Sequence, residues 1–348
     1  MKTIAYVIPY FGKFPKGFEF FLLSCKNNPT IDWLIFTDDK TNYEYPSNVK
    51  VTYYTFEEIK KKVQANFDFE IVLDRPYKFC DYKPAYGEIF HDELKDYDYW
   101  GMCDLDLAWG NIRKFITDDI LEKYERIGFL GHSTLFKNNP VVNARYKTRV
   151  KNGIDYVTAY TSECSFAFDE VGMDNIYNEL GINTYKNTIF ANLKKYDYGF
   201  FLDLMPENEA YKNQHQIFTI QDGKIIRYYL YKDKIYNEEF MYIHFWCRPI
   251  TYKPKKYSFE KSYVIYADVV EELNEEITNK YILKKSKRSK IKYYAKSIWY
   301  NRKKITLKRN CLFGVILQLG RKKKPECCYS CGNLTISSFI QTILLVLE

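Results

Sequence analysis

The chain has 348 residues, enough for one large α/β domain or two small ones, and 18% of its residues are aromatic. Its formal net charge of +8 is unevenly distributed, because residues 1–279 contain 35 Lys or Arg and 42 Asp or Glu, whereas residues 280–348 contain 17 and two. The overall basicity therefore does not indicate a nucleic-acid surface on the main part of the chain, and we expect no nucleic-acid partner.

The cysteines and the N-terminal sequence indicate the compartment. Six of the nine cysteines lie in or beside predicted strands and helices without a paired spacing, which favours reduced thiols. The apolar run after Met1 is too short for a signal peptide before Pro9 interrupts it, and no segment reaches the roughly 18 apolar residues of a membrane span. We therefore expect a cytoplasmic protein.

The first 60 residues alternate strand and helix patterns. We expect strands over residues 3–8, 33–37 and 49–54, and a helix over residues 18–25. Thr55 and Glu58 have the spacing of a capping box at the start of a further helix. This order predicts βαβ units, and therefore an α/β fold with a mixed, mainly parallel sheet flanked by helices.

Two acidic residues end the segment that we expect to be the central strand. Apart from Asp98, residues 97–103 are apolar or small at both odd and even positions, which indicates a strand buried on both faces. Asp104 and Asp106 follow, and because side chains alternate along a strand, their carboxylates point to the same side while Leu105 points away. An Asp-x-Asp also occurs in solvated turns, but two carboxylates ending a buried strand repel each other unless a cation lies between them. The pair therefore predicts a site for Mg²⁺ or Mn²⁺ and a diphosphate.

The sequence Tyr-Trp-Gly-Met-Cys-Asp-Leu-Asp-Leu-Ala-Trp-Gly at residues 99–110 resembles the Asp-x-Asp strand of GT-A nucleotide-sugar glycosyltransferases, especially those of bacterial capsule and lipopolysaccharide clusters. The resemblance implies a Rossmann-like GT-A catalytic domain over residues 1–275. It also implies Mn²⁺ or Mg²⁺ as cofactor, a nucleotide-diphosphate sugar as hexosyl donor, and an oligosaccharide or lipid-linked acceptor in surface polysaccharide biosynthesis.

The resemblance also implies residues that bind the nucleotide. In this family the loop after the first strand touches the nucleotide, so Pro9, Tyr10 and Phe11 are candidates to line the base pocket, with an ordinary βα turn as the alternative. Asp38 follows the predicted second strand, in a position that resembles the one holding ribose or base in such folds, although acidic turns are common there.

Two further pairs of candidates follow from the resemblance. Asp81 is expected to face the nucleoside and Lys83 the diphosphate, where a cation stabilises charge on the leaving group. The family often has arginine at the second position, and lysine keeps the charge without the bidentate fork. His244 resembles the histidine that completes the metal shell, and Arg248 the basic residue near the phosphates.

Three residues are candidates for the acceptor side. A β-like run over residues 161–168 places Glu163 among small and apolar neighbours that would raise its pKa, which makes it the first choice for a general base, followed by Asp169. His132 lies in a segment that resembles the part facing the sugar or acceptor, although a single histidine is more often a structural hydrogen-bonding residue.

Residues 276–348 are predicted to form a basic, amphipathic tail. Ile291, Tyr294 and Trp299 recur at helical spacing on a segment rich in Lys and Arg, which favours peripheral binding to the anionic inner face of the cell membrane. RNA binding and a partly disordered tail are the alternatives.

A glycosyltransferase is thus the function we expect. A metal-dependent nucleotidyltransferase or phosphohydrolase would use the same acids on a phosphate ester, and a non-catalytic carbohydrate-assembly protein is a further alternative. Residues 6–12 contain a single glycine, which does not favour the Gly-rich loop of a nucleotidyltransferase. Because one fold supports many activities, the choice depends on the site.

Overall fold

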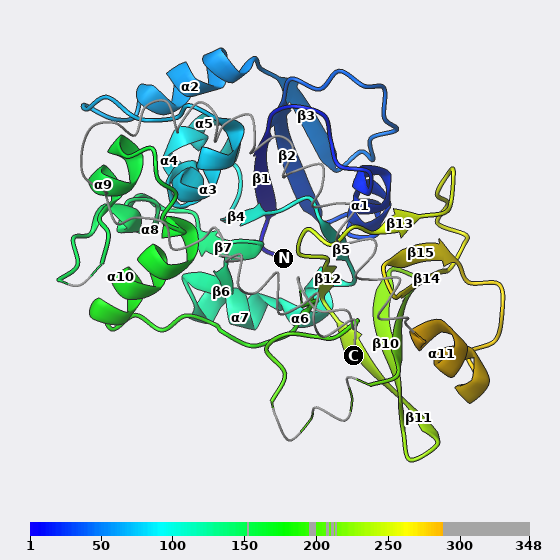
Figure 1. Cartoon of the computed structure of the whole chain (residues 1–348). Coiled ribbons are helices and arrows are strands. Elements are labelled where there is room, and N and C mark those ends of the chain that lie inside the picture. The colour runs from blue at the N-terminus through cyan, green and yellow to red at the C-terminus, as the bar shows by residue number, and fades with distance from the viewer. Residues whose placement is uncertain (152, 195–199, 207–208, 210–211, 213, 288–348) are drawn as a thin grey trace, which may run out of the picture.

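The computed structural model describes residues 1–151, 153–194, 200–206, 209, 212 and 214–287. The protein has an α/β fold in which a six-stranded mixed sheet is flanked by helices and is followed by two further sheets (Figure 1). The α/β class with a mixed sheet is therefore confirmed, and the arrangement is compatible with a Rossmann-like fold.

The first sheet has the strand order β3-β2-β1-β4-β7-β6. Its strands are β1 (Ile4–Tyr10), β2 (Ile31–Thr37), β3 (Val49–Tyr53), β4 (Tyr99–Cys103), β6 (Arg126–Leu130) and β7 (Ser133–Lys137). The first four run parallel, whereas β7 is antiparallel to both β4 and β6. The strand order reverses at β1, and in open α/β sheets such a reversal leaves a binding crevice at the carboxyl ends of the strands.

This sheet is buried on both faces. Ala5 and Val7 of β1 enter one hydrophobic cluster, and Tyr6 enters another on the opposite face. All five residues of β4 are buried, as expected for a central strand. Gly101 is required at its centre because a Cβ there would lie 2.6 Å from a methyl group of Leu135.

Helices cover both faces of the sheet. The cluster around Ala5 is completed by α2 (Phe56–Gln64), α3 (Phe79–Tyr82), α4 (Tyr86–Ile89), α5 (His91–Leu94), α8 (Pro140–Asn143), α9 (Tyr156–Thr161) and α10 (Met173–Glu179). The opposite face is covered by α1 (Phe18–Lys26), α6 (Ile112–Phe115) and α7 (Asp118–Lys123). The capping box of Thr55 and Glu58 at the start of α2 is confirmed.

Four shorter turns of helix connect these elements. They are η1 (Pro76–Lys78), η2 (Lys83–Ala85), η3 (Arg145–Lys147) and the π-helical η4 (Phe168–Gly172). The sequence of residues 77–90 leads into a predicted helix before the central strand. The structure has a series of short helical pieces there, since Pro84 has no N–H with which to continue an α-helix.

Two smaller sheets complete the fold. One contains β5 (Leu107–Trp109), β12 (Tyr242–His244) and β8 (Ala191–Asn192), in that order. The other has the order β11-β10-β9-β14-β15-β13 and consists of β9 (Gln216–Gln221), β10 (Lys224–Tyr231), β11 (Lys234–Phe240), β13 (Thr251–Tyr252), β14 (Tyr263–Tyr266) and β15 (Val269–Glu272). Phe20 of α1, Ala108 of β5 and Phe218 of β9 share one cluster, which packs both sheets against the first half of the chain.

Two strand predictions were wrong. Residues 161–168 contain the end of α9 and a bend, because Asp81 accepts the N–H groups of Phe166 and Phe168 and removes these donors from any strand ladder. The sequence of residues 241–249 also predicts a strand, but the observed strand β12 ends at His244, since Trp246 and Cys247 adopt the left-handed conformation.

The predicted tail begins with a packed helix. α11 (Asn279–Ser286) buries Tyr281 and Ile282 against Ile217 of β9, so the main unit extends past residue 276. The amphipathic segment from Ile291 to Trp299 lies outside the described residues. Within the described part of the chain, no helix is long and apolar enough to cross a membrane.

Candidate functional site

The Asp-Leu-Asp segment links two sheets. Asp104 follows β4 of the first sheet directly, and Asp106 precedes β5 of the three-stranded sheet. The segment therefore lies at the carboxyl end of β4, beside β1, where the strand order reverses. This is the edge at which an α/β sheet places its ligands.

The predicted convergence of acids and histidine is observed. One ligand atom from each of Asp104, Asp106 and His244 lies within 4.8 Å of the others. His244 Nε2 is 3.4 Å from Asp106 Oδ1. The histidine is brought there by β12, which pairs with β5 so that His244 lies opposite Leu107.

A residue that the sequence did not indicate orients this histidine. His244 Nδ1 is 2.7 Å from Asn192 Oδ1, and the pairing of β8 with β12 places the two residues opposite each other. With the Asn192 amide oxygen as acceptor, Nδ1–H donates this hydrogen bond, which fixes the ring with Nε2 facing Asp106. Metal-binding histidines are commonly held by such a hydrogen bond from the other ring nitrogen.

The Asp106 carboxylate is held from two sides. Its Oδ1 faces His244, and its Oδ2 accepts a hydrogen bond of 2.6 Å from the Cys247 N–H. Burial alone would raise the pKa of Asp106, but the interactions with His244 and the Cys247 N–H lower it to about 2. The group is therefore ionised at neutral pH and available to a cation.

Lys83 lies between two of the acids. Its Nζ is 2.7 Å from Asp104 Oδ1 and 3.6 Å from Asp169 Oδ2, and it donates a 2.8 Å hydrogen bond to the Gly131 carbonyl. Burial disfavours the ammonium form, but the adjacent Asp104 and Asp169 raise the pKa of Lys83 well above its ordinary value. The side chain is thus a fixed cation beside the Asp-x-Asp segment, and its role toward a diphosphate stays a prediction.

Asp169 is a buried acid with a pKa near neutrality. Burial raises the pKa of Asp169 to about 7, with Lys83 opposing this shift and Glu170 adding to it. The residue lies in η4, which follows Ala167 in the left-handed conformation with φ of 50°. A Cβ on Gly131 would collide with its carboxylate, so glycine is needed there for the close approach.

Glu163 does not meet the expectation for a general base. It is exposed and lies in a bend rather than in a strand, and its backbone carbonyl accepts a 2.7 Å hydrogen bond from Arg75. The buried, apolar surroundings expected for Glu163 are therefore missing, and Asp169 is the acid brought to the cluster.

Asp81 and Arg248 both contact other parts of the protein. The Asp81 carboxylate is fully buried and accepts a 2.8 Å hydrogen bond from Lys78. It also accepts hydrogen bonds from the backbone N–H groups of Phe166 and Phe168. Asp81 therefore holds the loop that leads to η4 instead of facing a nucleoside. The Arg248 Nε donates a 2.7 Å hydrogen bond to buried Asp268, which does not match the expected place beside the phosphates.

The residues expected to bind the nucleotide lie beside the cluster, in different environments. Pro9 and Tyr10 are the last residues of β1, one strand away from Asp104. Burial, together with the charges of Asp106 and other neighbours, raises the pKa of Tyr10, which shows that its hydroxyl lies in the field of the site. Phe11 is buried within the core. The Asp38 Oδ1 accepts a 2.7 Å hydrogen bond from the Gly12 N–H and so fixes the loop after β1.

His132 is buried behind His244. The two rings stack with their centroids 4.2 Å apart, and His132 Nδ1 is 3.0 Å from the Tyr242 hydroxyl. Burial and the neighbouring His244 lower the pKa of His132, so its ring is neutral at physiological pH. Its position is that of a packing partner of His244.

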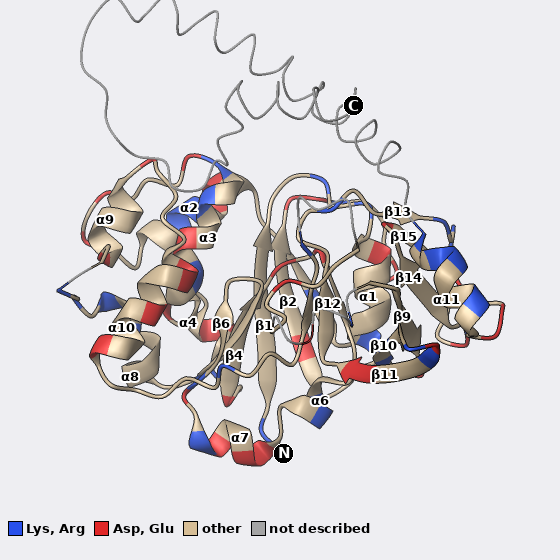
Figure 2. Cartoon of the chain, turned by 60° about the horizontal axis from the view of Figure 1, so that its bottom comes forward, with Lys and Arg blue, Asp and Glu red and all other residues tan. Residues whose placement is uncertain are grey.

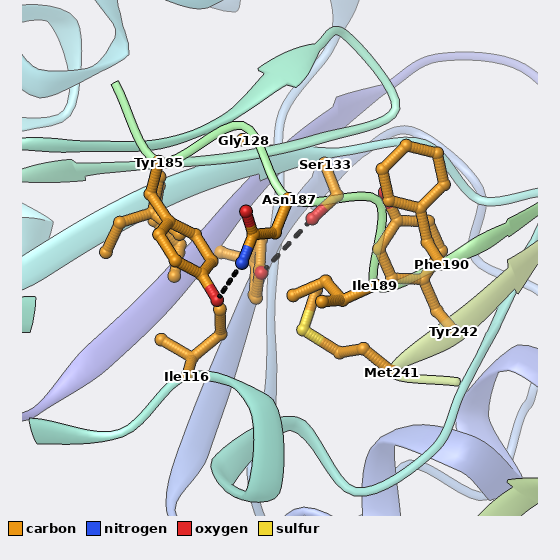
Figure 3. Close-up of a pocket in the computed structure, with 12 residues that line it drawn as sticks. Ile116, Gly128, Ser133, Tyr185, Asn187, Ile189, Phe190, Met241 and Tyr242 are labelled. Atoms are coloured by element: carbon orange, nitrogen blue, oxygen red, sulfur yellow. Dashed lines mark hydrogen bonds between the residues drawn. The ribbon is translucent and has the colours of Figure 1, made fainter. Parts of the chain in front are cut away.

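A small pocket lies beside Phe190 and Tyr242 (Figure 3). Phe190 and Tyr242 line it and also contact the His132 ring. The Tyr6 and Ser133 hydroxyls, 3.3 Å apart, form a polar pair there. None of its lining residues is acidic or basic, so this pocket lacks the groups that a diphosphate requires.

Residues 6–274 match a protein family that is described as a family of unknown function (DUF6625). No match was found among curated proteins. The family match includes the whole acid-and-histidine cluster but assigns it no chemistry, so the function has to be argued from the site.

Proposed function

The chain belongs to the DUF6625 family, whose function is unknown, and we propose that it is a metal-dependent glycosyltransferase of the GT-A type. Its donor is a nucleotide-diphosphate sugar, and its acceptor is an oligosaccharide or lipid-linked chain of a surface polysaccharide. The observation that carries the proposal is the convergence of Asp104, Asp106 and His244 with Lys83 at the carboxyl end of β4.

These side chains fit a divalent cation. Two carboxylates and one imidazole nitrogen suit Mn²⁺ or Mg²⁺, and the hydrogen bond between His244 Nδ1 and Asn192 leaves Nε2 available as a ligand. Asp104, Asp106 and His244 would hold the ion, which supplies positive charge against the donor diphosphate when bound.

The protein's own groups account for the rest of the proposed chemistry. An acceptor hydroxyl attacks the anomeric carbon, the bond from that carbon to the diphosphate oxygen breaks, and the nucleoside diphosphate leaves with the electron pair. The Lys83 ammonium stabilises the negative charge that develops on the leaving group. Asp169 takes the proton of the attacking hydroxyl, a role that its pKa of about 7 supports.

The nucleotide is expected in the crevice between β1 and β4, with Tyr10 beside the metal-binding residues. We place the reaction in the cytoplasm, at the inner face of the cell membrane. That location rests on the basic composition of residues 288–348.

The test is a thermal-shift screen of UDP-glucose, UDP-galactose, UDP-N-acetylglucosamine and GDP-mannose, each with and without Mn²⁺. A ligand present at about 100 times its dissociation constant adds ~2.7 kcal/mol of stability. We expect an Mn²⁺-dependent shift with at least one nucleotide sugar, absent in Asp106→Asn, followed by sugar transfer to an oligosaccharide. Nucleotide transfer or phosphate-ester hydrolysis by the same site would instead favour the nucleotidyltransferase or phosphohydrolase alternative. Binding without turnover would favour a carbohydrate-assembly protein.

A further inference from the structure

The chain makes an unusual turn directly after the metal-site histidine. Residues 245–248 form a turn in which Arg248 N–H donates a 2.9 Å hydrogen bond to the Phe245 carbonyl. Its two central residues are Trp246, with φ of 46°, and Cys247, with φ of 55°. The positive φ angles of both residues are those of a type I′ turn, which normally has Asn and Gly at these positions.

A tryptophan in this conformation costs free energy. Left-handed backbone crowds the Cβ of any residue other than glycine, and bulky side chains are found there only when their surroundings hold them. Here the turn is held on the site side by Asp106, whose backbone carbonyl accepts the Phe245 N–H at 2.9 Å and whose Oδ2 accepts the Cys247 N–H at 2.6 Å. On the other side, Arg248 pairs with buried Asp268.

The result of this conformation is the position of one indole ring. The Trp246 ring lies nearly parallel to the His244 imidazole, with centroids 6.4 Å apart and an interplanar angle of 23°. It is partly exposed, whereas the other three tryptophans of the described residues, Trp33, Trp100 and Trp109, are buried. Among the described residues, no ring other than that of His244 stacks on Trp246.

We propose that Trp246 is the platform for the donor's sugar ring. This inference rests on the proposed function. A single oxygen joins the β-phosphate to the anomeric carbon, so a diphosphate bound at Asp104, Asp106 and His244 carries its sugar into the space beside these residues. An indole face has a negative quadrupole and a large apolar area, both of which suit the C–H face of a pyranose. The left-handed turn is the conformation that presents the ring there.

The test compares a nucleoside diphosphate with its sugar conjugate. The probes are the nucleotide sugar that gives the largest Mn²⁺-dependent thermal shift in the panel above and the matching nucleoside diphosphate, each titrated calorimetrically with Mn²⁺. In Trp246→Ala we expect the nucleoside diphosphate to bind as in the wild type and the nucleotide sugar to bind about tenfold more weakly. Trp246→Phe keeps an aromatic face, so its affinity for the nucleotide sugar should lie between those of the wild type and Trp246→Ala.

Two glycine variants separate this role from a role in folding. Trp246→Gly removes the backbone strain together with the ring, so the melting temperature should be retained or raised while sugar binding falls as in Trp246→Ala. The matched control is Lys232→Gly, which relieves a left-handed residue (φ of 49°) in the turn between β10 and β11 and should leave both affinities unchanged.

A fluorescence measurement gives a direct readout. In a Trp299→Phe background, the nucleotide sugar should protect Trp246 from acrylamide quenching, and the nucleoside diphosphate should protect it less. Equal loss of both affinities in Trp246→Ala would make the residue a nucleotide contact, and no loss of either would remove it from the donor site. Either result overturns this inference and leaves the proposed function standing. If the wild type binds no nucleoside diphosphate with Mn²⁺, the proposed function fails and this inference fails with it.

Discussion

At the scale of single residues, Asp106 is the most sensitive position of the site. Its carboxylate is ionised, faces His244 and accepts the Cys247 N–H. Asp106→Asn keeps the shape and an oxygen for Cys247 but loses the charge, so Mn²⁺-dependent nucleotide binding and turnover should be abolished while the circular dichroism spectrum is unchanged. Asp92→Asn, at a fully exposed acid, is the control and should bind as the wild type. Full activity in Asp106→Asn would rule out the metal site.

The pKa of Asp169 predicts a pH dependence of stability. The pKa is raised from 3.8 to about 7, so between these values the folded protein holds a proton that the unfolded chain releases. The free energy of unfolding should therefore fall as the pH rises from about 4 to about 7, and this contribution should be constant above that range. Asp169→Asn removes this dependence. Urea denaturation of both proteins from pH 4.5 to 8 should show that the free energy of unfolding of the variant rises relative to that of the wild type as the pH rises. A constant difference between the two proteins would contradict the assignment.

Lys83 should affect both rate and pH dependence. Lys83→Ala removes the cation from Asp104 and from Asp169, so turnover should fall far more than in Lys83→Arg, which keeps the charge. Because Lys83 opposes the raised pKa of Asp169, the acid limb of the rate profile should move to higher pH in Lys83→Ala. Small and equal losses in both variants, with an unmoved profile, would exclude Lys83 from the chemistry.

At the scale of elements, the loop before η4 depends on one buried ion pair. Lys78 and Asp81 are both fully buried, and Asp81 also binds the N–H groups of Phe166 and Phe168. Removing one charge of such a pair leaves the other unpaired, which costs about 3–5 kcal/mol. Asp81→Asn should therefore lower the free energy of unfolding and make residues 160–170 susceptible to limited proteolysis. A variant of normal stability that binds nucleotides weakly would restore the nucleoside role expected from the sequence.

Local signals in the sequence predicted elements well where the structure is local. The capping box of Thr55 and Glu58 and the strands beside it depend on residues close in sequence. The same holds for the hairpin of β10 and β11, which the alternation of residues 224–236 predicts. The environments of Glu163 and Asp169 could not be predicted, because they depend on Asp81 and Lys83, more than 80 residues away. A tertiary contact thus converted a predicted strand into a bend followed by a π-helix.

The same limit applies to the proposed metal site. The convergence of Asp104 and Asp106 follows from the alternation of side chains along one segment, so it could be predicted. Asn192 could not, since it reaches His244 only through the pairing of β8 with β12, strands of two and three residues that have no distinctive pattern. The site is formed where three separate parts of the chain meet, and the sequence identified two of them.

At the scale of the whole molecule, charge distinguishes residues 1–287 from residues 288–348. The first part carries 39 basic and 42 acidic residues, and Figure 2 shows the two signs interspersed over the ribbon. The second part carries 13 basic and two acidic residues. Each Lys or Arg near an anionic lipid surface contributes ~1 kcal/mol, so only the second part has an electrostatic reason to bind a membrane.

The helix α11 fixes where the two parts should be separated. Tyr281 and Ile282 are buried against the sheet, so a truncation before α11 would expose core residues, whereas a chain that ends at Lys287 keeps them covered. This truncated protein should fold and transfer sugar to a short water-soluble acceptor as well as the full chain. In co-sedimentation with phosphatidylglycerol vesicles, the full chain should bind at low salt and be released in part at high salt, where charges are screened, and the truncated chain should stay in solution at both. Equal sedimentation of the two proteins, or binding of the full chain to RNA but not to vesicles, would overturn the membrane assignment and leave the catalytic proposal intact.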